Sequence, residues 1–439
     1  MTDLVETAPE RLRALAGLVL LMGVAYALST DRRRVSWRVV AWGLGLQLLF
    51  ALLVLRTPVG VAFFRAVNGL VSAVLGYAEE GGRFVFGNLV SDHVPVGTLE
   101  EGAFSATPEL VARTGALFAF RILPNIIFVS CLMTVLYHLR IMQHLVRAAA
   151  WVMQRTMRTS GAETLCAATN IFTGMIESPL TVKPFVERMT ESELMTVMTA
   201  GMATISGSLL VAYASMLLPH HPDAAGHLIA ASIMSAPAAF VMAKLLVPER
   251  GEPITKGELT LVVERPDVNV IDAAARGAGE GLRLALMVGA MLIAFIALVA
   301  MLNAMVGWAG GLFGIEGLSL ERILGAVFAP VAWMLGIAWT DAALVGRLIG
   351  VDVVLNEFVA FARLASALGA GAQLESRSLV IAIYALATFA NFGSVAMTIA
   401  GIGEIAPSRR HDLARLGLKA MLGGLLAALM TAAWAGVLV

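Results

Sequence analysis

Two glutamates, Glu177 and Glu357, stand inside long apolar stretches of the chain. A charged side chain is costly at membrane depth, so each is a candidate for function rather than packing. Carboxylates accept hydrogen bonds, and Asn391 and Ser394 offer both donors and acceptors. Together these four residues suit a polyhydroxylated ligand, whose hydroxyls could be bound in pairs. The alternative is that the glutamates pair with buried arginines such as Arg347 for structural reasons alone.

A second group of polar residues could bind a small cation. Sodium takes oxygen ligands, and unwound backbone supplies them where membrane helices are interrupted. The side chains of Asn170 and Thr204, with backbone carbonyls near Thr173 and Ile205, are candidates of this kind. The alternative is that Asn170 and Thr204 only cap the ends of broken helices. The spacing of these residues leaves both interpretations open.

The composition places these residues in a membrane protein. Of 439 residues, 59% are apolar and 14% charged, whereas soluble domains are about 25% charged. An ordinary soluble enzyme and a disordered chain are therefore excluded. The 31 basic and 31 acidic residues cancel, so no basic field favours a nucleic acid polymer as partner. No phosphate-binding loop or serine–histidine–acid set is recognisable, and we expect neither an enzyme nor a resident cofactor.

Eight stretches are apolar over the length of about 20 residues that a membrane-spanning helix needs. They are 12–30, 37–55, 114–137, 194–218, 225–247, 281–305, 378–402 and 414–438. Arginine-rich loops are retained in the cytoplasm, and such clusters follow the first and third stretches and precede the last. Both termini are therefore expected outside. The apolar stretch 59–78 carries Arg65 and Asn68 in its middle and is expected to lie in the outer interface.

Two further segments, 161–189 and 339–367, have the features of re-entrant hairpins that enter from opposite sides. Each begins and ends on one side and carries glycine and asparagine midway, and irregular backbone survives at membrane depth only beside protein or water. An interrupted span follows each hairpin, at 203–208 and 389–394. The predicted fold is an all-α polytopic membrane protein with eight transmembrane helices plus two oppositely oriented re-entrant hairpins in an inverted repeat, a transporter pattern.

This pattern divides the chain into five parts. They are N-terminal scaffold helices with the interfacial helix and outer loop (1–112), the first repeat (113–218), the fifth span and a cytoplasmic loop (219–280), the second repeat (281–404) and the last span (405–439).

Motifs spread along nearly the whole chain carry a family resemblance. They are Glu177-Ser178-Pro179-Leu180, the run NVIDAAARGAGEGLRLAL from Asn269, Asn356-Glu357-Phe358-Val359-Ala360, Phe389-Ala390-Asn391 and Ile405-Ala406-Pro407-Ser408-Arg409-Arg410. This set resembles the concentrative nucleoside transporter family, in its bacterial type. The resemblance implies import of nucleosides with sodium or protons across a bacterial inner membrane. It also implies a homotrimer whose hairpin domains move by an elevator mechanism.

The resemblance also implies roles for individual positions. Glu177, Glu357, Asn391 and Ser394 would hold the ribose, Phe389 would lie beside it, and Leu209 would lie near the base. The sodium positions of the family correspond here to Asn170, Thr173, Thr204 and Ile205.

Two places depart from the family pattern. Met175-Ile176 stands where the family usually has glutamine followed by threonine or serine, which bind the nucleobase. Without those polar groups, stacking and van der Waals contact would govern the base preference. Asp352 stands in place of a lysine, which changes the local charge by two units. It could carry a proton or pair with Arg347, and we favour the pair.

The function that we expect is sodium-coupled nucleoside import. Proton coupling through Glu177, Glu357 or Asp352, and transport of a related modified nucleoside or base, are the alternatives within the same class. A passive channel is disfavoured because the polar residues cluster at two midplane breaks rather than lining a continuous path. No feature specifically indicates a membrane-embedded enzyme.

Overall fold

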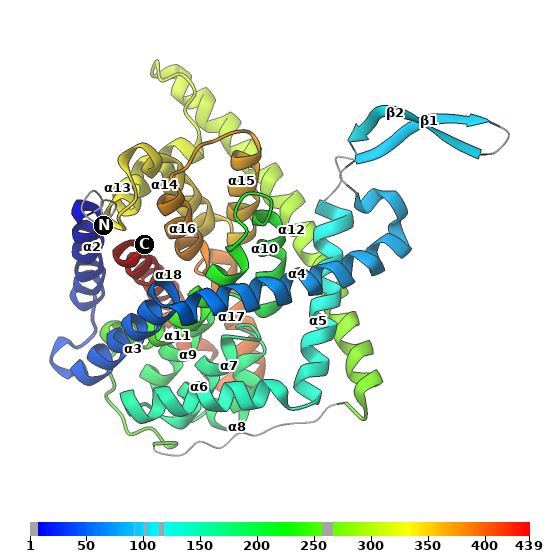
Figure 1. Cartoon of the computed structure of the whole chain (residues 1–439). Coiled ribbons are helices and arrows are strands. Elements are labelled where there is room, and N and C mark those ends of the chain that lie inside the picture. Colours follow the sequence, from blue (N-terminus) through cyan, green and yellow to red (C-terminus); the bar gives the residue numbers. More distant parts are fainter. Residues whose placement is uncertain (1–7, 92, 101–102, 114–117, 257–266) are drawn as a thin grey trace.

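The computed structural model describes residues 8–91, 93–100, 103–113, 118–256 and 267–439, and most of these are helical (Figure 1). Residues 1–7, the predicted start of the third span at 114–117 and the middle of the predicted cytoplasmic loop at 257–266 lie outside this described part. The helices are α2 (Ala8–Ala27), α3 (Trp37–Arg56), α4 (Pro58–Phe86), α5 (Leu123–His138), α6 (Ile141–Met157), α7 (Gly161–Asn170), α8 (Lys183–Val186), α9 (Glu191–Ala203), α10 (Gly207–Leu217), α11 (Ala224–Leu246), α12 (Val270–Leu312), α13 (Leu320–Met334), α14 (Trp339–Val354), α15 (Glu357–Gly369), α16 (Ser376–Leu386), α17 (Phe392–Ile405) and α18 (Arg410–Leu438).

Seven helical segments of the described residues are long and apolar enough to cross a membrane. An eighth is added if α13 and α14, which are bent by 119° at their junction, count together. Helix α2 occupies the first predicted stretch, but Glu10, Arg11 and Arg13 in its first turns keep it outside this group. The protein is therefore an all-α polytopic membrane protein in outline, and eight spans remain a prediction.

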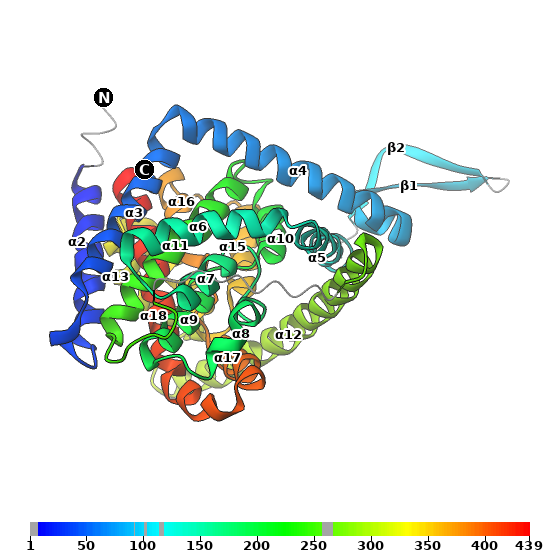
Figure 2. The same cartoon turned by 90° about the horizontal axis from the view of Figure 1, so that it is seen from below.

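Helix α4 contains the stretch 59–78 and lies across the other helices. It runs across the molecule in both Figures 1 and 2, whereas α5 is upright in Figure 1 and nearly end-on in Figure 2. Thr57 begins α4 by accepting a hydrogen bond from the Gly60 amide, and Pro58 occupies the first turn, where its missing N–H costs nothing. The orientation of α4 across the direction of α5 favours the expected placement of α4 in the membrane interface. The length and apolar composition of α4 would also suit a membrane-spanning helix.

The core of the molecule is formed by α9, α11 and α16, which are almost entirely buried, and by the buried second half of α18. Polar links fix the first hairpin segment against this core. Ser160 and Thr190 begin α7 and α9 with capping boxes, closed by Glu163 and Glu193. The Ser160 hydroxyl donates to Glu193, and Lys244 of α11 forms a buried ion pair with Glu163 at 2.7 Å. The start of α7 is thereby positioned on α9 and α11.

Helices are interrupted at the places that the sequence indicates. The chain after α7 is irregular over 171–177 and continues as a short 3-10 helix, Ser178–Val182. Residues 204–206 separate α9 from α10, and 387–391 separate α16 from α17. Residues 355–356 separate α14 from α15. The breaks are thus confirmed, whereas entry of the two hairpins from opposite sides of a membrane stays a prediction.

Two regions differ from the sequence expectation. The predicted outer loop contains an antiparallel β-hairpin of β1 (His93–Glu100) and β2 (Ala103–Arg113), which projects away from the helices in Figure 1. Helix α12 begins at Val270, inside the predicted cytoplasmic loop and before the predicted span at 281–305. Asn269 caps it, and Arg276 binds Asp267 and Glu280, so the charges of its first turns are satisfied.

Candidate functional site

A cavity of about 700 Å³ lies between the two halves of the chain, bounded by the hairpin segments, the broken helices, α5 and α12. Its walls include all eight residues that the sequence nominated for ligand binding. They are Met175, Ile176, Glu177, Leu209, Glu357, Phe389, Asn391 and Ser394. Thr173 also lines it, so one nominated cation residue borders the same space.

Glu357 lies at the first turn of α15, where the positive end of the helix dipole favours a carboxylate. Asn356 begins this helix by accepting a hydrogen bond from the Val359 amide at 2.9 Å. The Glu357 carboxylate accepts hydrogen bonds from Tyr213 at 2.9 Å and from the Asn391 side-chain amide at 3.1 Å. Sequence reasoning missed Tyr213, because no spacing connects a tyrosine of α10 with a glutamate of α15.

Asn391 and Ser394 are positioned by the break between α16 and α17. Asn391 caps α17 by accepting a hydrogen bond from the Ser394 amide at 2.9 Å. The break is fixed to the end of α9, because the Phe389 amide and the Thr388 hydroxyl both donate to the Met202 carbonyl. The Ser394 hydroxyl has no hydrogen-bond partner within the described part of the chain, so it can serve a ligand in the cavity.

The tip of the first hairpin segment presents Glu177 to the cavity from the opposite side. Glu177 is exposed, and its carboxylate lies beside Gly174, where an added Cβ would stand 2.6 Å from Oε2. Met175 is buried and accepts a hydrogen bond from Thr398 on its sulfur at 3.6 Å. Ile176 is 43% exposed. The tip therefore brings one carboxylate and one apolar side chain into the space that Glu357 borders.

The structural alternative for the two glutamates, pairing with arginine, is wrong within the described residues. Arg347 is exposed and donates to the Ala343 carbonyl of its own helix at 3.3 Å. Asp352 does not pair with Arg347 either. It is fully buried, and neither of its carboxyl oxygens has a hydrogen-bond partner among the described residues. The two side chains stand five positions apart on one helix, which turns them to different faces.

The nominated cation residues meet where the first hairpin segment contacts the break after α9. The Asn170 amide donates to the Thr204 hydroxyl and, at 2.7 Å, to the Ala200 carbonyl. Ser178, which the sequence did not nominate, donates to the Asn170 side-chain oxygen at 3.2 Å. Ile205 is buried in the break, and the Thr173 hydroxyl donates to the Thr169 carbonyl. The Asn170 amide nitrogen therefore joins the Thr204 hydroxyl to the Ala200 carbonyl, and sodium binding at this contact stays a prediction.

The cavity extends from Glu357 to a charged rim formed by α5, α12 and the turn after α5. Arg140, Asp267, Arg276, Glu280 and Arg283 lie on this rim. Hydrogen bonds from the Arg276 guanidinium, the nearer at 2.6 Å, hold the pKa of Asp267 below its ordinary value. Arg140 belongs to the arginine cluster that the sequence assigns to the cytoplasm.

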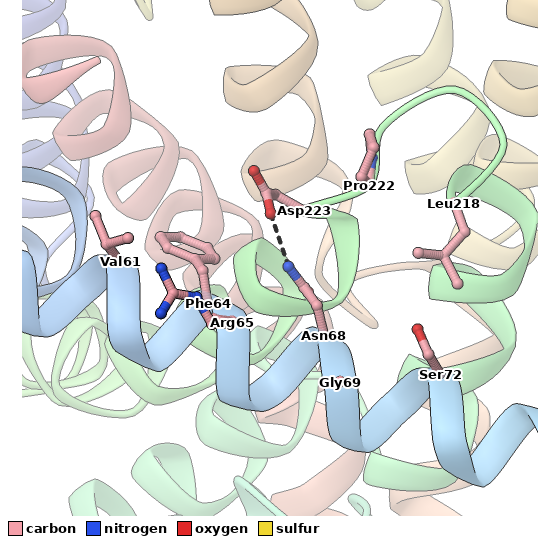
Figure 3. Close-up of a pocket in the computed structure, with 9 residues that line it drawn as sticks. All are labelled: Val61, Phe64, Arg65, Asn68, Gly69, Ser72, Leu218, Pro222 and Asp223. Atoms are coloured by element: carbon pink, nitrogen blue, oxygen red, sulfur yellow. Dashed lines mark hydrogen bonds between the residues drawn. The ribbon is translucent and has the colours of Figure 1, made fainter.

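A second cavity of about 570 Å³ lies between α4 and the turn from α10 to α11 (Figure 3). Asn68 bridges its two sides, because its side chain donates to Asp223 at 2.7 Å and accepts from the Gly226 amide at 3.0 Å. The ring of Phe64 packs on His227, with 4.7 Å between ring centroids. Gly226 permits this approach, since a Cβ there would stand 2.0 Å from the Phe64 ring.

Sequence profiles of one transporter family match most of the chain. The profile described as the C-terminus of the Na+ dependent nucleoside transporter matches residues 227–436, and the N-terminal profile matches 16–89. A profile described as "Nucleoside recognition" matches 119–219.

Relatives from distant organisms align with nearly the whole chain. An uncharacterized transporter of Bacillus subtilis, YutK, is 41% identical over 97% of this chain and 98% of its own. Sodium/nucleoside cotransporter 1 of Mus musculus is 39% identical over 98% of this chain. The chain spans 64% of the length of that mammalian protein.

A solved transporter has the same fold. CNTnw in an inward-facing substrate-bound state matches with a TM-score of 0.86 at 41% identity, covering 97% of each chain. A variant of CNTnw in an outward-facing state matches with a TM-score of 0.88, covering 98% of each chain.

Proposed function

This chain belongs to the concentrative nucleoside transporter family, and from that premise we propose that it imports nucleosides by symport with sodium. Members of the family are membrane transporters rather than enzymes, and solved inward- and outward-facing states support alternating access. The observation that carries the proposal is the meeting of Glu177, Glu357, Asn391 and Ser394 around one cavity. Two acidic acceptors with amide and hydroxyl groups suit the hydroxyls of a ribose.

The proposed ribose site is centred on Glu357. Its carboxylate is oriented by Tyr213 and Asn391, and a carboxylate retains acceptor capacity after accepting two hydrogen bonds. Glu177 approaches from the other half of the chain, and the Ser394 hydroxyl, which has no partner among the described residues, also lines the cavity. A ribose between them would exchange hydrogen bonds with both halves, so its binding would connect the two hairpin segments.

The proposed base site is apolar. Met175, Ile176, Leu209 and Phe389 line the cavity beside the ribose residues. These side chains offer dispersion contact and, from Phe389, ring stacking, but no hydrogen bonds that distinguish one base edge from another. We therefore propose a broad base preference, extending to modified nucleosides.

Sodium is proposed to bind where Asn170 and Thr204 meet. Its ligands would be the Asn170 amide oxygen, the Thr204 hydroxyl, and backbone carbonyls near Thr173 in the segment after α7 and near Ile205 in the break after α9. The Asn170 amide group lies against Thr204 and Ala200 through its nitrogen, so a turn of this group would bring its oxygen to the proposed ion. Sodium would fix the tip of the first hairpin segment to the break after α9, and so order Glu177 for the nucleoside.

The proposed cycle is an elevator motion within each subunit of a homotrimer in a bacterial inner membrane, with both termini periplasmic. In the present conformation the cavity reaches the rim at Arg140, which the sequence assigns to the cytoplasm. We therefore assign this conformation as inward-facing. The exposed apolar face of α12, with Ile293 76% and Trp308 71% exposed, supports a position against lipid or a neighbouring subunit.

The test is uptake of radiolabelled uridine and adenosine into proteoliposomes. An inward sodium gradient is compared with the same gradient of potassium. We expect accumulation above the external concentration with sodium only. Accumulation that persists in potassium and collapses with a protonophore would reject sodium coupling, and uptake of neither nucleoside by intact protein would reject the substrate.

A further inference from the structure

Asp352 is a carboxyl group that the proposed transport site does not use. It lies near the end of α14 with 0% of its surface exposed. Val345 and Ile349, at helical spacing on the same helix, are also fully buried, so Asp352 continues an apolar, inward-facing stripe. Neither carboxyl oxygen has a hydrogen-bond partner among the described residues.

The charged and titratable groups around α14 do not compensate a carboxylate at this position. Glu357 of α15 and Tyr213 of α10 lie within electrostatic range of Asp352, and both are acidic groups. The cations of the elements packed nearby are engaged elsewhere: Arg347 on the Ala343 carbonyl, Arg322 on the Glu316 carbonyl, Arg363 on Glu321 and Arg377 on Glu10. Asp341, on the first turn of α14, accepts a hydrogen bond from the Glu375 amide.

Asp352 and Glu357 therefore form a carboxyl pair in unequal surroundings. Glu357 accepts two hydrogen bonds, which favour its ionised form, and it stands at a helix N-terminus. Asp352 accepts none among the described residues and is fully buried, where an uncompensated charge is very costly. Unequal surroundings of this kind separate an acid from a base. We infer that Asp352 is a proton-binding site, neutral at pH 7 in this conformation.

The proton stabilises the packed form of the second hairpin segment. A carboxyl that is neutral when buried and ionised when exposed favours the buried state at low pH and loses this preference as pH rises. The break at 355–356 joins Asp352 to Glu357, so loss of the proton would disturb the helix end that positions Glu357. This consequence for transport rests on the proposed function, whereas the protonation itself does not.

The direct test is infrared spectroscopy of the purified full-length protein in nanodiscs at pH 7, because a protonated carboxyl has a carbonyl band that a carboxylate lacks. We expect this band in the wild type, complete loss of the component that belongs to Asp352 in Asp352→Asn, and the same loss in Asp352→Leu. Asp341→Asn is the matched control, and it should retain the band. A wild-type spectrum identical to that of both Asp352 variants would overturn the inference.

The second test is the pH dependence of nucleoside uptake. Wild-type uptake should fall about tenfold for each pH unit above the titration of Asp352, and Asp352→Asn should flatten this fall. An equally steep fall in Asp352→Asn would overturn the link to transport. If nucleosides are not transported at all, the proposed function fails, and the infrared result still decides the protonation of Asp352.

Discussion

At the scale of single residues, Glu357 has two donors, Tyr213 of α10 and the side-chain amide of Asn391 in the break before α17. Glu357→Gln removes the negative charge and replaces one carboxylate oxygen with an NH2 group. This group is a donor and would face the donors of Tyr213 or Asn391. Hydrogen bonds to charged groups contribute about 1.5–3 kcal/mol each, so we expect uridine uptake to fall by at least about 100-fold. Tyr213→Phe removes one of the two bonds and should lower uptake about tenfold. Initial uptake rates in proteoliposomes check both, and near-normal uptake by Glu357→Gln would remove it from the ribose site.

The apolar tip of the first hairpin segment gives a second prediction. Met175→Gln with Ile176→Thr places donors and acceptors beside the base, so competition by unlabelled nucleosides should separate purines from pyrimidines by about 1–2 kcal/mol, or roughly 5–30-fold. Leu180→Met, on the same wall but outside the nominated set, is the control and should leave the competition profile unchanged. A double variant with the wild-type profile would show that these positions do not contact the base.

Single residues could be identified as site candidates from the sequence where a charged side chain lies in an apolar segment, because burying that charge is energetically costly. Glu177 and Glu357 stand out because a charge in an apolar run requires a reason, and the structure brings both to one cavity. Tyr213 and Ser178 could not be nominated, because a hydroxyl is unremarkable in a helix until its partner from another helix is known. The predicted pairing of Asp352 with Arg347 was wrong because the prediction used only the opposite charges of the two residues. It did not take into account that their side chains point to different faces of the helix.

At the scale of elements, the first hairpin segment and the break after α9 meet at Asn170 and Thr204. Asn170→Ala and Thr204→Ala each remove one proposed sodium ligand, so the sodium concentration for half-maximal uptake should rise about tenfold, while the nucleoside preference stays the same. Thr196→Ala is the matched control, since this buried threonine of α9 bonds only the Ser192 carbonyl of its own helix in the described structure. Sodium titrations of both variants that coincide with the wild type would place the ion elsewhere.

Helix α4 is joined to the start of α11 by one side chain. Asn68→Ala removes two hydrogen bonds, each contributing about 1 kcal/mol, and should lower the thermal midpoint in nanodiscs by a few degrees. Asn68→Asp should lower it further, because two carboxylates would then face each other at Asp223. Ser72→Ala, in the same cavity, should leave the midpoint unchanged. Equal midpoints for all three variants would show that this contact is not stabilising.

Elements were predictable where a local rule governs them. The breaks at 204–206 and 387–391 follow from glycine and asparagine in otherwise apolar helices, and the structure has them. The β-hairpin was not predicted, because its strands project from the molecule and need no apolar core face. The early start of α12 was missed because Arg276 and Glu280 look like loop residues until their ion pairs are known.

At the scale of the whole molecule, two groups of helices follow from the contacts. Helices α5 and α12 pack closely, with Gly277 and Gly281 admitting the backbone of α5. The first hairpin segment instead packs on α9 and α11, and the second packs on α16. The cavity lies between these two groups, an arrangement consistent with the proposed elevator motion. The helix breaks could be predicted from the sequence, and the repeat of span, hairpin and broken span stays a prediction, whereas the close packing of α5 on α12 could not be predicted.

The contact of α4 with α11 allows a test of motion between the two groups. Because α4 leads to α5, whereas α11 belongs to the buried helices, Asn68 and Asp223 should separate when the cavity turns outward. Asn68→Cys with Asp223→Cys, in a background lacking Cys131, should be joined by a short bifunctional thiol reagent, since the native side chains are 2.7 Å apart. We expect the linked protein to bind nucleoside and sodium but to lose uptake about tenfold or more, and each single cysteine to transport normally after the same treatment. Linked protein that transports at the unlinked rate would mean that α4 and α11 move as one body, and the motion would then have to occur at the surface of α5 and α12.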